Sequence, residues 1–327
     1  MSYRSSENMS LFNRIVARLL PLAPRAMVRY FSRHYIAGEQ LSDAVRVVRE
    51  LMDQGACATI DVLGEEVTTV AQTRAAVSTY HEVLEAIRRD RLDANISLKP
   101  THMGLKIDPD LCHDNIASLA EVAAEMGCLV RLDMEDHSCT DATLQVYRRL
   151  RERFDNVGTV LQAYQRRTIA DINGLMDLKP SLRICKGIYV EPRAVAYKDP
   201  EIVRQSFSYA VEKLLSGGSH VGIATHDERL VFDALRTVDR LGLGRGDYEF
   251  QMLLGVEEEL RRTIIAQGHR LRVYVPFGRE WLAYSIRRLK ENPAIVGHVL
   301  RQMWRRRGVR TPLPAPAPKR KLPPSTT

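Results

Sequence analysis

The segments LVRLDM (129–134) and DATLQVYRRLRERF (141–154) show the pattern on which most of this chain is built. The first is a short apolar run that carries Asp133 close to its end. The second places apolar residues at helical spacing among charged ones. A short run rich in Val and Leu, followed by an amphipathic helix, is typical of one βα unit in a buried parallel sheet.

Seven further runs of this kind follow the same pattern, and amphipathic stretches such as PEIVRQSFSYAVEKLL (200–215) lie between them. The runs are ATIDVL (58–63), NISLK (95–99), GTVLQA (158–163), LRICK (182–186), VGIATH (221–226), YEFQML (248–253) and LRVYVP (271–276). Eight βα units in one chain predict a (β/α)8 barrel of the TIM type rather than an open sheet. A Gly-rich GxGxxG turn does not follow the first run, which argues against a Rossmann domain.

Composition indicates a globular protein with one large core. The chain has 327 residues, of which 45% are hydrophobic and 27% are charged. The net charge of +8 comes from the segment 301–327, which holds eight basic residues and no acidic one. A nucleic-acid-binding protein is expected to carry its basic excess on the folded body, so no nucleic-acid partner is predicted. The five cysteines show no CxxC spacing, which predicts a reducing, cytoplasmic location.

The two ends of the chain differ from its middle. Residues 9–35 have apolar residues at helical spacing until Pro21 and Pro24 interrupt the pattern. We expect helices that pack on the domain; a membrane-surface helix and an Arg-rich transit peptide remain open alternatives. The Pro-rich basic tail is expected to be disordered, and either solvated or attracted to anionic lipid. The predicted division is an N-terminal helical segment (1–56), a barrel (57–308) and this tail (309–327).

Polar residues end the apolar runs, and in a barrel the strand ends surround the active site. These residues are Asp61, Lys99, Asp133, Gln162, Lys186, Thr225, His226, Gln251 and Tyr274. Partly buried charges cost desolvation energy unless they are paired. A ring of them at one level therefore predicts a ligand-binding or catalytic site.

Three clusters allow more than one interpretation. The acidic stretch at 133–136 with His137 suggests a metal site, but it lacks a second His at fixed spacing, so no metal is predicted. Thr225 and His226 lie just before a predicted helix, where they can bind a phosphate or a ring. Arg287 and Arg288 suit a carboxylate, although Glu291 stands at the right spacing for an ordinary salt bridge within the helix.

Nine blocks together resemble the proline dehydrogenase family, over roughly residues 57–300. They are IDVLGE, ISLKPTHMGL, VRLDMED, VLQAYQRR, LRICKGIYVEP, GIATHDE, YEFQMLLGV, RVYVPFG with REW, and IRRLKENP. The resemblance implies a distorted (β/α)8 barrel with FAD at its mouth and an eighth helix over the site. It also implies that L-proline is oxidised to 1-pyrroline-5-carboxylate by hydride transfer to the flavin. Electrons would then pass to quinone at the inner face of the membrane, and a separate pyrroline-5-carboxylate dehydrogenase would complete the conversion to glutamate.

The same resemblance implies roles for the substrate site. Arg287 and Arg288 resemble the paired arginines that hold the proline carboxylate, and Lys99 resembles the lysine that joins them. Asp133 resembles the catalytic aspartate that orders these cations. The residues that would border the substrate ring are Tyr274, Tyr284 and Leu253.

For the flavin, Arg183 resembles an arginine that stabilises negative charge on the reduced ring. The other expected flavin contacts are Met134, Gln162, Lys186, Gly187, Ile188, Thr225, His226 and Glu291. One position departs from the family pattern, because the usual KGAY motif reads KGIY here. A larger side chain at Ile188 predicts a reshaped pocket and an altered preference among cyclic amines.

Two other functions fit the bare barrel. The first is a Schiff-base aldolase that uses Lys99 or Lys186 at a strand end. The second is a regulator that binds flavin or proline without turnover. The visible spectrum of the protein, before and after anaerobic proline, distinguishes the three functions.

Overall fold

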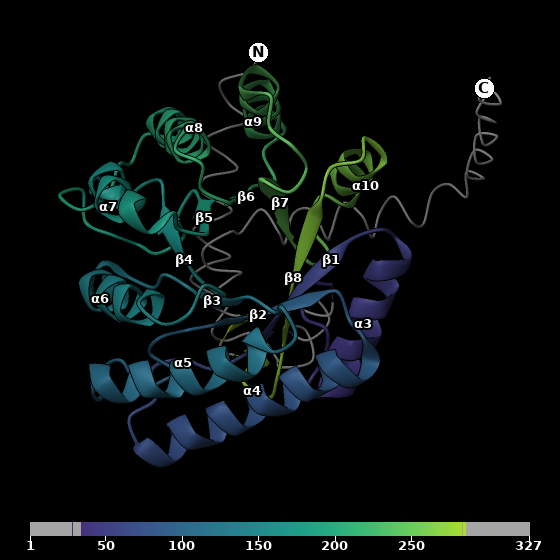
Figure 1. Cartoon of the computed structure of the whole chain (residues 1–327), viewed down its shortest axis with the longest axis vertical. Coiled ribbons are helices and arrows are strands. Elements are labelled where there is room, and N and C mark those ends of the chain that lie inside the picture. Colours follow the sequence, from purple (N-terminus) through teal and green to yellow (C-terminus); the bar gives the residue numbers. More distant parts are fainter. Residues whose placement is uncertain (1–27, 29–33, 283, 286–327) are drawn as a thin grey trace. The chain divides into compact units, whose positions relative to one another are not determined.

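The computed structural model describes residue 28, residues 34–282, and residues 284 and 285. Their centre is a closed barrel in which every strand pairs with its sequence neighbours and β8 pairs with β1, all in parallel (Figure 1). The strands are β1 (Cys57–Val62), β2 (Ala94–Leu98), β3 (Val130–Leu132), β4 (Val157–Gln162), β5 (Leu182–Cys185), β6 (Val221–Ala224), β7 (Tyr248–Leu253) and β8 (Leu271–Phe277). The predicted barrel is therefore confirmed, and each predicted run overlaps one strand.

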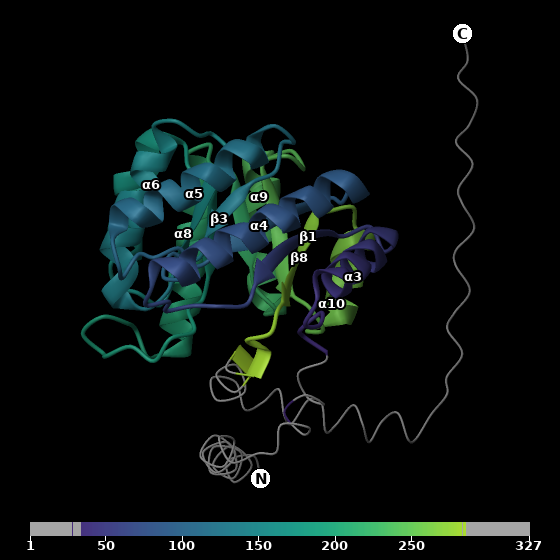
Figure 2. The same ribbon diagram turned by 90° about the horizontal axis from the view of Figure 1, so that it is seen from below.

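Helices surround this barrel and bury their apolar faces against it (Figures 1 and 2). They are α3 (Leu41–Asp53), α4 (Val70–Asp90), α5 (Pro109–Ala124), α6 (Thr140–Arg151), α7 (Thr168–Leu175), α8 (Pro200–Ser216), α9 (Glu228–Leu241) and α10 (Glu258–Ala266), with short 3-10 turns η2 (His137–Cys139) and η3 (Met176–Leu178). The sequence marks several starts clearly. Asp108, Asp199 and Asp227 cap α5, α8 and α9 by accepting backbone N–H groups.

Helix α3 precedes the first strand and packs against β1 and β8. In a regular barrel each helix follows its strand, so the outer face of β8 is normally covered by the helix that comes after it. Here α3 covers that face, with Ala44, Val48 and Leu51 buried. This is the distortion that the described part of the barrel shows.

The barrel interior is polar where most barrels are filled by branched apolar side chains. Arg272 donates to Glu249 at 2.8 Å in the interior, and both side chains are almost completely buried. Arg131 lies opposite Gly158 in the strand register. A Cβ atom on Gly158 would lie 2.5 Å from Nη1 of Arg131, so the glycine makes room for the guanidinium.

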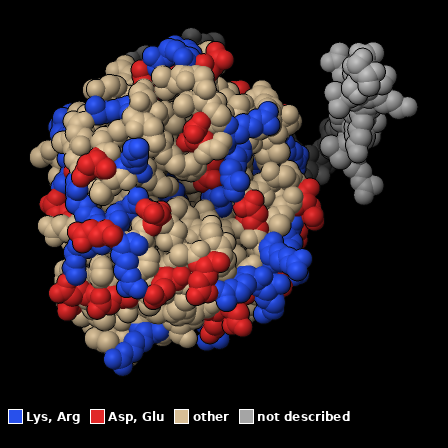
Figure 3. Space-filling view, viewed as in Figure 1, with Lys and Arg blue, Asp and Glu red and all other residues tan. Residues whose placement is uncertain are grey.

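Exposed ion pairs join neighbouring helices around the barrel. On the face in Figure 3, basic and acidic side chains are interspersed rather than separated. The interhelix pairs include Arg49–Asp90, Arg88–Glu125, Arg149–Asp110, Arg229–Glu201 and Arg240–Glu212. Each exposed pair typically contributes no more than about 1 kcal/mol, so burial of the apolar helix faces remains the main stabilising contribution.

Several expectations concern residues outside the described part of the chain. They include most of the N-terminal helices at 9–35, the tail at 309–327, and Arg287, Arg288 and Glu291. The boundaries of the three predicted segments remain predictions. Among the described residues, no helix is both long enough and apolar enough to cross a bilayer.

Candidate active site at the carboxyl ends of the strands

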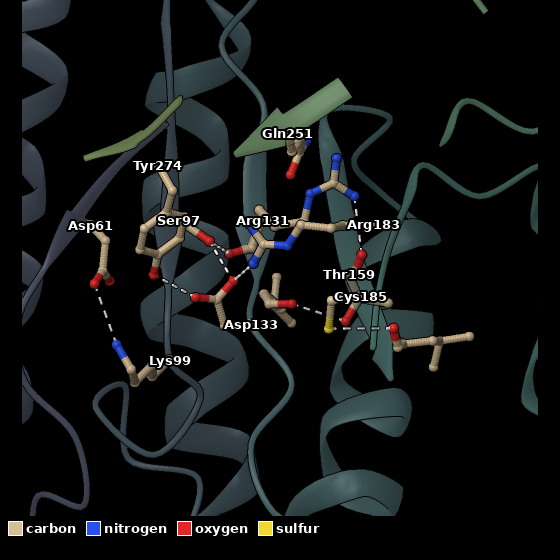
Figure 4. A network of polar contacts seen from close by, with 12 residues as sticks. Asp61, Ser97, Lys99, Arg131, Asp133, Thr159, Arg183, Cys185, Gln251 and Tyr274 are labelled. Atoms are coloured by element: carbon tan, nitrogen blue, oxygen red, sulfur yellow. Dashed lines mark hydrogen bonds and ion pairs between the residues drawn. The ribbon is translucent and has the colours of Figure 1, made fainter. Parts of the chain in front are cut away.

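Asp133 is the centre of a buried hydrogen-bond network at the barrel mouth (Figure 4). It follows β3, and its oxygens accept from Ser97 Oγ at 2.6 Å, from Tyr274 Oη at 2.7 Å and from the Arg183 guanidinium. Burial acts to raise the pKa of Asp133, but Arg183 and Lys99 hold it below its usual value. The carboxylate therefore stays ionised and fixes the side chains that donate to it.

Arg183 and Tyr274 also contact each other directly. The Arg183 guanidinium lies 5.4 Å from the centre of the Tyr274 ring, within cation–π range. Burial alone would lower the pKa of Arg183, but the charge of Asp133 raises it above its usual value. A permanent cation is thus held against an aromatic face at the strand ends.

The counter-ion of Lys99 is Asp61, a residue for which the sequence predicted no specific role. Lys99 Nζ lies 3.4 Å from Oδ2 of Asp61, and both side chains are buried. Tyr80 Oη hydrogen-bonds Oδ1 of Asp61 at 3.4 Å and donates to the carbonyl of Ser97 at 2.7 Å. Burial opposes the charge of Lys99, but Asp61 and Asp133 hold the pKa of Lys99 above its usual value. Lys99 is therefore a charged, buried lysine beside the Asp133 network.

Tyr284 extends the site above β8. It is 7% exposed, and its electrostatic interactions reach both Lys99 and Tyr274. The predicted substrate residues Lys99, Tyr274 and Tyr284 are thus close to one another. Leu253 ends β7, the strand next to that of Tyr274, and the strand register places Leu253 beside Tyr274. The paired arginines and Glu291 lie outside the described residues.

Residues at the ends of β3 and β4 form a second layer. Gln162 Nε2 donates to the carbonyl of Glu135 at 2.9 Å. The Glu135 carboxylate accepts from Thr101 N at 2.9 Å and from Thr101 Oγ1 at 2.6 Å. Met134 is buried between Asp133 and Glu135. Gln162 and Met134, both predicted flavin contacts, therefore lie on a firmly held segment next to Asp133.

The other predicted flavin residues lie beyond β5 and β6. Lys186 Nζ binds Oδ2 of Asp227 at 3.0 Å, and Arg204 Nε binds the same oxygen at 2.9 Å. Thr225 Oγ1 accepts the backbone N–H of Asp227 at 3.1 Å. The two cations meet beside the start of α9, where a helix N-terminus favours anions. A phosphate-bearing group suits this donor set.

His226 makes a contact that the sequence did not predict. Its Nε2 accepts the backbone N–H of Leu253 at 2.8 Å, which joins the end of β6 to the end of β7. Since Nε2 is an acceptor here, a neutral ring must carry its proton on Nδ1. His226 therefore joins the ends of two neighbouring strands, and its role as a flavin contact stays a prediction.

Gly187 and Ile188 follow β5 with an unusual backbone. Gly187 has φ +110°, and a Cβ atom there would lie 2.1 Å from Cδ1 of Tyr164. Only glycine fits that position without strain. Ile188, by contrast, is 36% exposed, which is high for a large apolar side chain.

Metal chemistry gains no support from the acidic stretch at 133–136. Within the residues that the structure describes, no group of three or more His, Cys, Asp and Glu side chains is arranged to hold an ion. The members of that stretch have other partners, as described for Asp133 and Glu135. His137 binds Glu191 instead, at 2.5 Å from its Nδ1.

Comparisons with known proteins agree on one family. A family model described as proline dehydrogenase matches residues 44–301. Proline dehydrogenase 1 of Bacillus subtilis (strain 168) is 35% identical over 273 residues, which cover 84% of this chain and 90% of that protein. Proline dehydrogenase of Deinococcus radiodurans is 35% identical over 298 residues, 87% of this chain and 96% of that protein.

Solved structures show the same fold. The crystal structure of proline utilization A from Bdellovibrio bacteriovorus, inactivated by N-propargylglycine, matches with a TM-score of 0.75 and 23% identity. The match covers 80% of this chain but only 32% of that one, so the present chain spans about a third of that protein's length.

Proposed function

Because this chain belongs to the proline dehydrogenase family, we propose that it oxidises L-proline to 1-pyrroline-5-carboxylate by hydride transfer to bound FAD. Proline oxidation is the activity for which the relatives are named, and they match nearly their full length. The single observation that carries the proposal is the buried Lys99–Asp61 ion pair beside the Asp133 network that holds Tyr274. Tyr284 interacts electrostatically with both Lys99 and Tyr274. A buried cation beside two aromatic rings suits a small cyclic amino acid with a carboxylate.

Lys99 binds the proline carboxylate. Asp61 holds its ammonium in place and keeps it charged before substrate arrives. The same charge argues against the aldolase function for Lys99, because a Schiff-base lysine needs a lowered pKa and that of Lys99 is raised. Tyr274 and Tyr284 border the proline ring and exclude water from it.

Arg287 and Arg288 complete the carboxylate clamp in this proposal. Two described contacts between residues four apart support it: Tyr284 N to the carbonyl of Glu280 at 3.5 Å, and Ser285 Oγ to the carbonyl of Trp281 at 2.6 Å. If this helical pattern continues, Arg287 and Arg288 share the face of Tyr284, three and four residues on. Glu291 then follows one turn further.

The cofactor site is formed by residues after β3 to β6. FAD, when bound, would supply the acceptor for a hydride from the ring carbon that lies beside the nitrogen on the side away from the carboxylate, while the proline amine gives up its protons as the C=N bond forms. Arg183, fixed by Asp133, supplies a permanent positive charge for the reduced ring. Gln162 and Met134 lie beside it, while Gly187 and Ile188 offer a close backbone approach. Lys186, Thr225 and His226 lie near the start of α9, where the phosphate groups fit.

The electron acceptor and the location are further parts of the proposal. Electrons leave for a membrane quinone, and a separate pyrroline-5-carboxylate dehydrogenase takes the product on to glutamate. A cytoplasmic protein at the inner face of the membrane suits this sequence of reactions. The basic tail supplies charge for anionic lipid. Deleting residues 311–327 should weaken binding to anionic liposomes, and unchanged binding would remove the tail from this role.

The visible spectrum of the purified protein tests the function. We expect a flavin spectrum that anaerobic L-proline bleaches. A colourless protein that borohydride traps with substrate would indicate the aldolase, and a yellow protein that proline leaves unbleached would indicate the regulator.

The Lys99→Met variant tests the carboxylate site. Losing one partner of a buried charged contact typically costs about 2–5 kcal/mol, so kcat/KM for proline should fall by about 30-fold or more. Lys106→Met is the matched control, because Lys106 lies on the same loop but pairs with Glu66 at the surface. Equal effects in the two variants would show that Lys99 does not hold substrate.

A further inference from the structure

The loop between β5 and α8 lies against the loop that follows β4. Tyr164 N donates to the carbonyl of Lys186 at 2.9 Å, and Tyr197 N donates to the carbonyl of Tyr164 at 2.8 Å. Arg166 N donates to the carbonyl of Val195, also at 2.9 Å. Figure 2 shows this loop at the end of the barrel where β8 also ends. Both ends of the loop are thus held by backbone hydrogen bonds, while Val190 between them is almost fully exposed.

Glu191 anchors the middle of this loop. Its side chain is 2% exposed, and both oxygens bind one residue. Oε1 accepts the backbone N–H of His137 at 2.8 Å, and Oε2 lies 2.5 Å from Nδ1 of His137. An ionised carboxylate only accepts hydrogen bonds, so Nδ1 carries the proton. Lys198 Nζ donates to the backbone carbonyl of Glu191, which holds the same residue from the other side. We call the Glu191–His137 contact the clasp.

The clasp joins the two halves of the candidate site. His137 starts η2, two residues after Glu135, and therefore belongs to the segment that carries Asp133. Glu191 lies three residues after Ile188. The strand β4 runs between β3 and β5, so the clasp spans across the end of a strand. A shift of either loop would move the residues after β3 relative to those after β5.

Tyr164 connects the clasp to Gly187. Its ring packs so closely on Gly187 that the glycine has no room for a side chain. The charge of Glu191 raises the pKa of the Tyr164 hydroxyl, after burial as the larger cause, so the two side chains are near each other. Tyr164 therefore packs on Gly187 and lies within the electrostatic reach of Glu191.

We propose that Glu191 is a positioning residue which, through His137, fixes Lys186, Gly187 and Ile188 in the geometry that the flavin requires. This inference rests on the proposed function, because it assigns the segment after β5 to the cofactor. Glu191 does not touch substrate. It holds the backbone on which a close approach depends, and a buried carboxylate with both oxygens on one residue suits that task.

Three variants test the clasp. Glu191→Ala removes the clasp. His137→Ala removes the ring contact, and because the His137 side chain is half-exposed, this substitution should disturb folding less than the one at the buried Glu191. Glu191→Gln preserves both contacts without the charge, since the amide oxygen accepts the backbone N–H and the amide nitrogen donates to Nδ1 of the other tautomer. His113→Ala is the matched control, because His113 contacts Asp114 at 2.9 Å in an exposed pair on α5.

We expect a hydrogen bond to a charged group to be worth about 10- to 100-fold in affinity, so Glu191→Ala should raise the Kd for FAD by that factor. His137→Ala should do the same, Glu191→Gln should fall in between, and His113→Ala should leave the Kd unchanged. The flavin absorption band of the protein at saturating FAD should also shift in Glu191→Ala. In the flavin-free protein, amide hydrogen exchange at residues 187–198 should be faster without the clasp.

The outcomes separate the clasp from the function. Unchanged Kd and band shape in Glu191→Ala and His137→Ala, while the unsubstituted protein binds FAD, would overturn the clasp alone. Unchanged exchange at 187–198 would do so too. If the unsubstituted protein does not bind FAD, the proposed function fails, and this role for the clasp fails with it.

Discussion

Replacing Asp133 by Asn should destabilise the barrel more than the loss of any exposed ion pair. The carboxylate accepts from Ser97, Tyr274 and Arg183, and the side chains of Arg183 and Asp133 are both largely buried. Removing one charge of a buried pair typically costs about 3–5 kcal/mol because the other charge is left uncompensated. For a domain of this size, that lowers Tm by about 6–20 °C.

Thermal unfolding followed by circular dichroism measures the effect, with Asp93→Asn as the matched control. Asp93 pairs with Arg270 at 3.1 Å, but its side chain is 52% exposed, so its loss should cost less than about 1 kcal/mol. The pKa of Asp133 is lower in the folded protein than its ordinary value of 3.8, so its stabilisation is present above that pH and lost as pH falls below it. The Tm values of the unsubstituted protein and of Asp133→Asn should therefore converge in acid. A loss of 1 kcal/mol lowers Tm by about 2–4 °C in a domain of this size. The reasoning would be refuted if the Tm of Asp133→Asn lay within about 2 °C of that of Asp93→Asn.

Three further predictions address single positions. Burial is the main cause that lowers the pKa of His102 from 6.5 to about 4. The free energy of unfolding should therefore fall by about 3 kcal/mol as the pH falls through that window. In His102→Gln the free energy of unfolding, measured with urea, should depend less on pH. Gly187→Ala should lower the free energy of unfolding by about 1–3 kcal/mol and weaken flavin binding, because the new Cβ meets Tyr164. Gly218 also has positive φ but has open space around it, so Gly218→Ala should bind flavin normally. Equal flavin titrations for the two variants would contradict this. Ile188→Ala should raise kcat/KM for 4-hydroxyproline relative to proline by about tenfold, and an unchanged ratio would remove Ile188 as a determinant of substrate choice.

The sequence located the strands and the level of the site well. Asp133, Lys99 and Tyr274 stand at the ends of apolar runs, and all three meet at the barrel mouth. Parallel strands buried on both faces leave a local signal, since both faces are apolar and the ends are not. The closed barrel then brings equivalent ends to one level, whatever their distance along the chain.

Partners were harder to predict than positions. No local pattern favoured Asp61 over Asp133 as the direct counter-ion of Lys99, yet Asp61 lies 3.4 Å from Lys99. Nor did it show that His226 would accept from the backbone of Leu253, 27 residues on. Each choice depends on which side chains point inward on adjacent strands, and therefore on the register.

The amino-acid sequence by itself determined the (β/α)8 fold and the polar ring at the strand ends, because both follow from local patterns of apolar and polar residues. The family was indicated separately, by the resemblance of nine sequence blocks. Only the tertiary structure decided which charges pair, why Gly158 and Gly187 carry no side chain, and that Glu191 reaches His137 across β4. The physical reason is that a contact between residues dozens of positions apart exists only once barrel closure has placed their strands and loops side by side. Burial then favours pairs in which a charged group is compensated.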